Sequence, residues 1–219
     1  GGSYTIIDYV YDIAQLLHQT RATPSVIMGH SLGGSISLLY SGIYPENVTK
    51  LISIEGMGPP PGMFDMYGKT GPHARLEAWV GNLRQLSGRM PKRYSSLEDA
   101  FQRMQTENPH LSEDQARHLT IHGSNQNEDG SYSWKFDNYV RAFAPIGLSP
   151  EETWKIYARI DCPTLLIHGA ESWASNPQDD GRSKAFNDSS VAGIEGAGHW
   201  VHHDQLERFL HVAREFLDS

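Results

Sequence analysis

The sequence predicts an α/β fold in which parallel strands alternate with helices. Short apolar runs with β-branched residues, typical of buried strands, recur at 25–28, 51–55, 164–168 and 190–195. Segments with apolar residues at helical spacing stand before, between and after these runs. The length of 219 residues suits one domain, or one domain that carries an inserted subdomain.

The first quarter of the chain reads as helix, strand, helix and strand in that order. Residues 5–19, TIIDYVYDIAQLLHQ, repeat apolar residues at helical spacing, which predicts an amphipathic helix. A short turn leads to the strand at 25–28, and a second helical pattern runs from about 31 to 43. The run LISIE at 51–55 is apolar almost throughout, as expected of a strand that is buried on both faces of a parallel sheet.

The character of the sequence changes between Gly58 and Asp161. The strand pattern stops there, and helical fragments rich in Met, Trp, Tyr and polar residues take its place. We therefore expect a core formed by 1–58 and 162–219 and a helical cap at 59–161. After the cap two strand patterns return, and an amphipathic helix, QLERFLHVAREFL, closes the chain.

Composition excludes several classes of partner. The formal net charge is -8 and the basic residues form no cluster, so neither nucleic acid nor an anionic membrane surface is an expected partner. No apolar run approaches the roughly eighteen residues that span a bilayer. The single cysteine, Cys162, excludes an intrachain disulfide, and no signal peptide pattern is visible. We expect a cytoplasmic protein.

A candidate nucleophile stands at the first strand-to-helix turn. Gly29-His30-Ser31-Leu32-Gly33 matches the pattern G-x-S-x-G, with a strand before it and a helix after it. A serine in such a sharp turn projects its Oγ away from the backbone, and the flanking glycines leave room for the turn. The helix N-terminus supplies free N–H groups, so the Leu32 backbone N–H is expected to donate to a developing oxyanion.

A serine nucleophile needs a base, and the chain has 11 histidines. His199, in the segment GAGHW between the last strand and the last helix, is placed to reach the sheet edge where Ser31 lies. His202 is expected to face solvent, while His30 and His168 read as packing or hydrogen-bonding residues. We expect no metal, and the chemistry implies no organic cofactor.

The sequence resembles the α/β-hydrolase family. The serine stands near the start of the chain, the histidine near its end, and a cap is inserted after a strand. The resemblance covers essentially the whole chain, with GHSLGG, LISIEG, CPTLLIHGAE and GAGHW in the family's order. The cap segment EDGSYSWKFDNY looks like one found in capped members, including the serine-hydrolase-like group and C–C bond hydrolases. The resemblance implies a mostly parallel sheet with an inserted helical cap.

The same resemblance implies that strands are missing before the first helix. Family members carry several strands there, together with a loop that donates the second oxyanion N–H. We therefore expect this chain to supply only the C-terminal half of the sheet. A missing N-terminal segment, or a second chain, is expected beside the nucleophile strand, because a buried parallel sheet leaves no edge unpaired.

The third member of a triad is the least certain from the sequence. The commonest family pattern places an aspartate in Gly-x-x-Asp, but here Ser172 stands in that place, after Gly169. Glu171 is one candidate acid. The other is Glu55, at the end of LISIE, because a glutamate there is the acid in one branch of the family. We favour Glu55, and expect its carboxylate within about 2.6–3.2 Å of His199 Nδ1. A structural role for Glu55, capping the turn that follows, stays open.

These observations favour a serine hydrolase that cleaves a carboxylic ester or related acyl compound through an acyl-enzyme. A C–C bond hydrolase on the same triad, or a non-catalytic ligand-binding protein of the same fold, are the alternatives. The expected partner is a small-molecule acyl substrate. Candidate residues for its pocket are His30, Met57, Phe64, Trp134 and Trp200.

Overall fold

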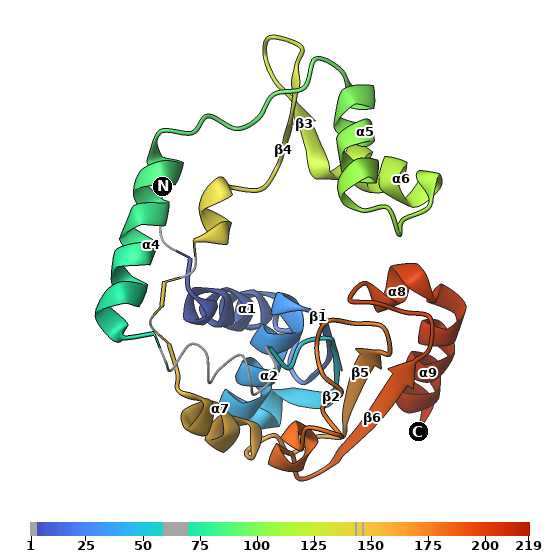
Figure 1. Cartoon of the computed structure of the whole chain (residues 1–219). Coiled ribbons are helices and arrows are strands. Elements are labelled where there is room, and N and C mark those ends of the chain that lie inside the picture. Colours follow the sequence, from blue (N-terminus) through green and yellow to red (C-terminus); the bar gives the residue numbers. More distant parts are fainter. Residues whose placement is uncertain (1–3, 59–69, 143, 146) are drawn as a thin grey trace. The chain divides into compact units, whose positions relative to one another are not determined.

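The computed structural model describes residues 4–58, 70–142, 144–145 and 147–219 (Figure 1). The chain divides into two compact units, which we call the core unit and the inserted unit. The core unit comprises Thr5–Gly71 and Ile146–Ser219, and the inserted unit comprises Gly1–Tyr4 and Pro72–Pro145. Phe64, a predicted pocket residue, lies outside the described residues.

The core unit contains a sheet of four parallel strands. In spatial order they are β1 (Ser25–His30), β2 (Val48–Ile54), β5 (Thr164–Gly169) and β6 (Ser189–Ile194). Each strand lies where the sequence predicted one. Because the strands are parallel, their carboxyl ends meet at one edge of the sheet, where open α/β sheets place their sites.

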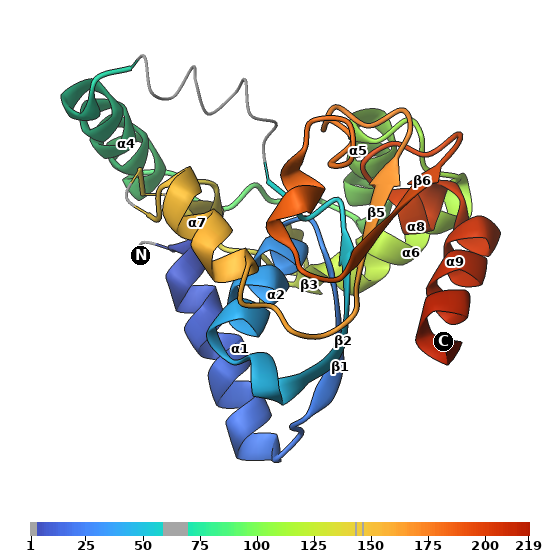
Figure 2. The same cartoon turned by 90° about the horizontal axis from the view of Figure 1, so that it is seen from below.

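Helices cover both faces of this sheet, as Figure 2 shows. One face carries α1 (Ile6–Thr20), α2 (Leu32–Ile43) and α7 (Pro150–Tyr157), and the other carries α8 (Val201–Asp204) and α9 (Leu206–Asp218). The alternation of side chains along each strand builds the two layers of core. On β2, Leu51 packs into the first cluster and Ile52 into the second, and both are fully buried.

Local chemistry fixes where the first helix begins. Thr5 Oγ1 accepts a hydrogen bond from the Asp8 N–H, and the Asp8 carboxylate accepts one from the Thr5 N–H at 2.7 Å. This capping box satisfies two N–H groups that the helix itself leaves free. The amphipathic pattern then turns Val10 into the core beside α2. Two short 3-10 helices, η1 (Pro45–Asn47) and η3 (Arg182–Ala185), complete the unit.

The inserted unit is mostly helical. Its elements are α4 (Pro72–Ser87), α5 (Leu97–Glu107), α6 (Glu113–Gly123), the strands β3 (Ser124–Gln126) and β4 (Tyr132–Trp134), and η2 (Asn138–Arg141). The expectation that the strand pattern stops here is wrong for the antiparallel hairpin β3–β4. Each strand has three residues, which is too short for any alternation to be recognisable in the sequence.

The strand β1 is one of the two outer strands of the core sheet, and β6 is the other. Within the described part of the chain β1 pairs with β2 alone. Its side chains Val26 and Met28 are 49% and 45% exposed, unusually high values for apolar residues on a parallel strand. Among the described helices, none is long and apolar enough to cross a bilayer.

Candidate active site

Ser31 lies at the sharp turn between β1 and α2. Its φ of 54° and ψ of -120° put a non-glycine residue in a backbone conformation that L-residues rarely adopt. The turn needs glycine at one position before Ser31 and at one position after it. A Cβ on Gly29 would stand 2.3 Å from the Gly33 carbonyl oxygen, and one on Gly34 would stand 2.7 Å from Gly56 Cα. Gly33 differs from the expectation, since a Cβ there would meet no described atom within 4 Å.

The start of α2 places the expected oxyanion donor. The helix begins at Leu32, immediately after Ser31. The first N–H groups of a helix have no partner within the helix and carry partial positive charge. The Leu32 N–H is one of these groups, so it is available to a negative oxygen formed at Ser31.

His199 lies on the loop between β6 and α8, across the sheet edge from Ser31. Its Nε2 is 2.9 Å from Ser31 Oγ. The loop is anchored at two points. His30 Nε2 donates to the His199 backbone carbonyl at 2.7 Å, and the Gly198 N–H donates to Asp204 at 2.9 Å. His30 therefore holds the histidine loop.

Glu55 follows β2 directly and lies beneath His199. Its Oε2 is 3.1 Å from His199 Nδ1, so the contact expected from the sequence is present. The side chain of Glu55 is 1% exposed, and its φ is 51°, again in the left-handed region. Glu171, the alternative acid, is exposed, and the Nδ1 of His199 faces Glu55 instead.

Four donors surround the Glu55 carboxylate. Oε1 accepts from His168 Nδ1 at 3.0 Å and from the Gly169 N–H at 2.8 Å, and Oε2 accepts from Ser172 Oγ at 2.6 Å in addition to facing His199. Burial alone would raise the pKa of Glu55, but the hydrogen bonds from His199, Ser172 and Gly169 outweigh burial and hold that pKa below its ordinary value. The Glu55 carboxylate is therefore an anion whose two oxygens both have hydrogen-bond donors.

Arg182 is a buried residue of this region that sequence reasoning missed. Its side chain is 3% exposed, and all three of its nitrogens are used. Nε donates to Asp180 at 2.7 Å, Nη1 to the carbonyls of Met57 and Gly58, and Nη2 to the Ser175 carbonyl at 2.9 Å. It thereby joins the loop that follows Glu55 to the loop that follows β5. One arginine among many gives no sequence signal for this role.

His202 does not face solvent as the sequence suggested. Its ring lies 4.8 Å from the His30 ring, edge to face, and its Nδ1 is buried. Burial lowers the pKa of His202 to about 4, and the nearby His203 and His30 add to this effect. Burial also lowers the pKa of His30. The imidazoles beside His199 are thus kept neutral near pH 7.

The predicted pocket residues are divided between the units. Met57 is buried in the core unit, Trp200 packs against His203, and Trp134 belongs to the inserted unit, where its indole donates to Tyr94. A mainly apolar pocket of about 210 Å³ lies in the core unit. Its lining includes Ile6, Ser35, Leu39, Met57, Leu148 and Trp154. Sequence reasoning had named only Met57 of these.

Comparisons with known proteins agree with this architecture. A sequence model of the alpha/beta hydrolase fold matches residues 2–206. The chain is 26% identical over 213 residues to the sn-1-specific diacylglycerol lipase ABHD11 of Xenopus laevis, covering 95% of this chain and 62% of that protein. It is 27% identical over 220 residues to the (lyso)-N-acylphosphatidylethanolamine lipase of Homo sapiens, covering 92% and 61%. The chain thus spans about three fifths of the length of these curated relatives.

Solved structures share the fold of this chain. The hypothetical protein PA1622 from Pseudomonas aeruginosa PAO1 matches with a TM-score of 0.79 at 23% identity. The match covers 98% of this chain and 73% of that one. The predicted fold class, a parallel sheet with helices on both faces, is confirmed.

Proposed function

The chain belongs to the alpha/beta hydrolase fold family, and on this premise we propose that it is the C-terminal part of a serine hydrolase that cleaves a carboxylic ester. The substrate is a small acyl compound. The names of the relatives, which include lipases of diacylglycerol and of N-acylphosphatidylethanolamine, support an ester of this kind. A fold alone does not carry a reaction, so the proposal depends on the site.

The observation that carries the proposal is the line of contacts from Ser31 through His199 to Glu55. Ser31 Oγ and His199 Nε2 are 2.9 Å apart, and His199 Nδ1 and Glu55 Oε2 are 3.1 Å apart. Both distances are within the range of hydrogen bonds. Because ionised Glu55 only accepts, His199 Nδ1 carries the proton, which leaves Nε2 free to accept from the serine.

This arrangement supports acyl transfer in two steps. Ser31 Oγ attacks the ester carbonyl while His199 Nε2 takes its proton, and the oxyanion that forms lies at the Leu32 N–H. His199 then gives the proton to the leaving alcohol, and an acyl-enzyme remains. Water, deprotonated by His199, attacks this ester and releases the acid. Glu55 stabilises the imidazolium that forms in each half of the reaction.

We take the apolar pocket as the place of the acyl chain. Ser35, which lines it, stands one helical turn after Ser31 on α2, and Met57 stands two residues after Glu55. Ile6, Leu39 and Trp154 supply apolar surface, as a methylene chain requires. His30, whose ring lies 5.0 Å from the His199 ring, and Trp200, which follows His199 in the sequence, remain candidates for contacts near the reacting carbonyl.

Two further parts of the proposal concern what accompanies the core. The exposed apolar side chains Val26 and Met28 on β1 support an additional strand-bearing segment, or a second chain, at this edge. The inserted unit at 72–145 is proposed to act as a cap, within the predicted segment 59–161. The cytoplasmic location stays a prediction of the sequence.

Hydrolysis of p-nitrophenyl esters of graded chain length by the natural full-length protein tests the function. We expect saturable turnover that Ser31→Ala and His199→Ala each lower by about a thousandfold or more, with cooperative unfolding preserved. Turnover above about a tenth of the wild-type value in either variant would contradict the triad. A protein that binds acyl compounds without turnover would instead be the non-catalytic alternative.

A further inference from the structure

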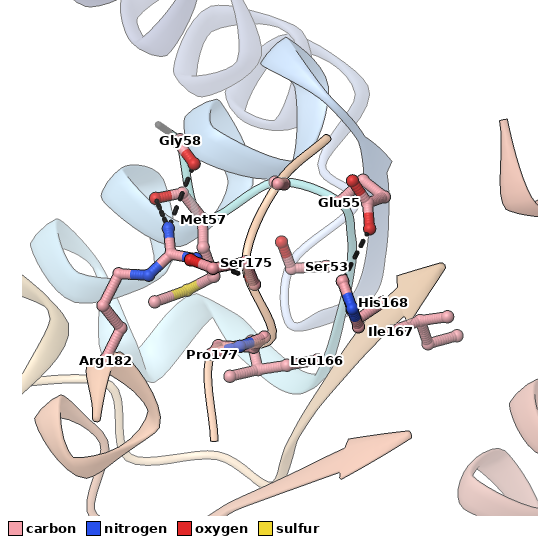
Figure 3. A pocket seen from close by; sticks show the side chains of 12 residues that line it. Ser53, Glu55, Met57, Gly58, Leu166, Ile167, His168, Ser175, Pro177 and Arg182 are labelled. Carbon is pink, nitrogen blue, oxygen red and sulfur yellow. Dashed lines mark hydrogen bonds and ion pairs between the residues drawn. The ribbon is translucent and has the colours of Figure 1, made fainter. Parts of the chain in front are cut away.

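A small pocket lies beside Glu55 (Figure 3). Its lining includes Glu55, Ser53, His168 and Arg182. The free volume is about 10 Å³, which is room for about one water molecule and for no part of a substrate. The polar groups here therefore do not bind an acyl compound, and the contact of His168 with Glu55 needs another explanation.

His168 makes the most informative of these contacts. Figure 3 shows its imidazole directed from the end of β5 at the Glu55 carboxylate, and Nδ1 is 3.0 Å from Oε1. The side chains are 10% and 1% exposed, so water barely competes for this hydrogen bond. Since the carboxylate is an anion that only accepts, the His168 Nδ1 carries the proton and donates.

The two oxygens of the Glu55 carboxylate have different hydrogen-bond partners. Oε2 faces His199 and is also held by Ser172, while Oε1 is held by His168 and by the Gly169 N–H. Two donors on each oxygen leave the carboxylate one orientation. Without the His168 donor, Oε1 would keep only the hydrogen bond from the Gly169 N–H, and a buried carboxylate with an unmet lone pair would turn to find another donor.

We propose that His168 is a positioning residue for the triad acid, whose Nδ1–H holds Oε1 of Glu55 so that Oε2 stays directed at His199. This inference rests on the proposed function, because it assigns His168 a task only if Glu55 is the acid. His168 acts through Glu55 and touches neither substrate nor the serine. Its effect is therefore felt when His199 becomes an imidazolium, which happens in the transition state and not in the substrate complex.

The test uses two substitutions in the natural full-length protein, with p-nitrophenyl butyrate as substrate. His168→Leu removes the donor, and His168→Asn keeps an N–H donor on a neutral side chain. We expect His168→Leu to lower kcat about tenfold or more with KM within threefold of the wild type. His168→Asn should retain at least about half of the wild-type kcat. Wild-type kcat in His168→Leu, or equal losses in both variants, would overturn the inference.

Glu55→Gln, measured alongside, separates this inference from the proposed function. If Glu55→Gln loses kcat by about a thousandfold while His168→Leu does not lose any, only the positioning role fails. If Glu55→Gln keeps its kcat, the triad fails and the role of His168 fails with it. Should His168→Leu not fold, His168→Asn and His168→Met are compared instead. The Met variant has no N–H donor and should lower kcat at least tenfold below His168→Asn, and equal values would refute the proposal.

Discussion

The hydroxyl of Ser172 donates a 2.6 Å hydrogen bond to Oε2 of Glu55, the same oxygen that lies 3.1 Å from Nδ1 of His199. The serine that stands where the commonest family pattern has an aspartate thus contacts Glu55, the proposed acid. The serine at position 172 and the glutamate at position 55 are therefore linked, because the serine donates a hydrogen bond to that glutamate. Ser172 also accepts a hydrogen bond from the Ala174 N–H at 3.2 Å, which fixes its hydroxyl.

Ser172→Ala should lower kcat about tenfold, because a hydrogen bond to a charged group contributes roughly 1.5–3 kcal/mol. A sharper test moves the acid. Glu55→Gln should lower kcat by about three orders of magnitude, and adding Ser172→Asp should recover at least about tenfold of this loss, since the new carboxylate arises beside His199 Nδ1. Steady-state kinetics of the wild type, Glu55→Gln and the double variant on one ester measure these differences in kcat. A double variant no more active than Glu55→Gln would show that position 172 does not reach the histidine.

Arg182→Met should destabilise the protein by about 3–5 kcal/mol, because it leaves Asp180 and three backbone carbonyls without their buried donor. Urea unfolding measures this difference. Arg182→Lys should fall between the wild type and Arg182→Met, since an ammonium cannot reproduce the planar set of donors. Arg208→Met, on the exposed side of α9, is the matched control and should change stability by less than about 1 kcal/mol. Equal effects at positions 182 and 208 would contradict the role of Arg182.

The stability of the folded chain should fall as the pH drops from about 6.5 to about 4. The pKa of His202 is about 4 when folded and 6.5 ordinarily, so within this window the unfolded chain binds a proton that the folded chain excludes. Above the window both states are neutral, and below it both are protonated. The neighbouring His203, His30 and His199 also lower the pKa of His202, whereas Asp204 raises it.

His202→Asn removes one titrating group from this window. The free energy of unfolding of the variant, measured in urea at half-unit steps of pH, should therefore decline less steeply between pH 6.5 and 4 than that of the wild type. Above pH 7 the two curves should run parallel. Parallel curves across the whole range would show that His202 does not carry the effect.

If the protein is the ester hydrolase proposed above, Leu148→Trp should shift its preference toward esters with shorter acyl chains. Leu148 lines the apolar pocket and is 38% exposed, so a larger side chain fits the backbone but fills the pocket. The octanoate to butyrate ratio of kcat/KM should fall about tenfold, if roughly two methylene groups lose burial worth about 0.8 kcal/mol each. Leu206→Trp, at a leucine 50% exposed on α9, should leave the ratio unchanged. An unchanged ratio in Leu148→Trp would place the acyl chain elsewhere.

Much of the core unit was predictable because its signals are local. Each parallel strand is a short apolar run, and the turn at Ser31 needs glycines that stand beside it in sequence. The contact between Glu55 and His199 was expected because a glutamate at the end of this strand is the acid in one branch of the family that the sequence resembles.

The remaining features depend on contacts between distant segments. The donors of Arg182 reach Met57 and Gly58 over more than a hundred residues of chain, and no spacing in the sequence encodes this pairing. His168 could be recognised as a hydrogen-bonding residue but not as a partner of Glu55, because the register of β2 against β5 decides which side chains meet. The hairpin β3–β4 was missed because each of its strands has only three residues.

The central claim, that Ser31 is a nucleophile activated by His199, is tested most directly by a fluorophosphonate probe and mass spectrometry of the natural full-length protein. The tryptic peptide from Ala22 to Lys50 contains Ser31 and four other serines, so fragmentation must locate the adduct. We predict a single adduct on Ser31 in the wild type, and its loss in His199→Ala under the same conditions. An unmodified Ser31 in folded protein, or labelling that persists unchanged in His199→Ala, would contradict the account.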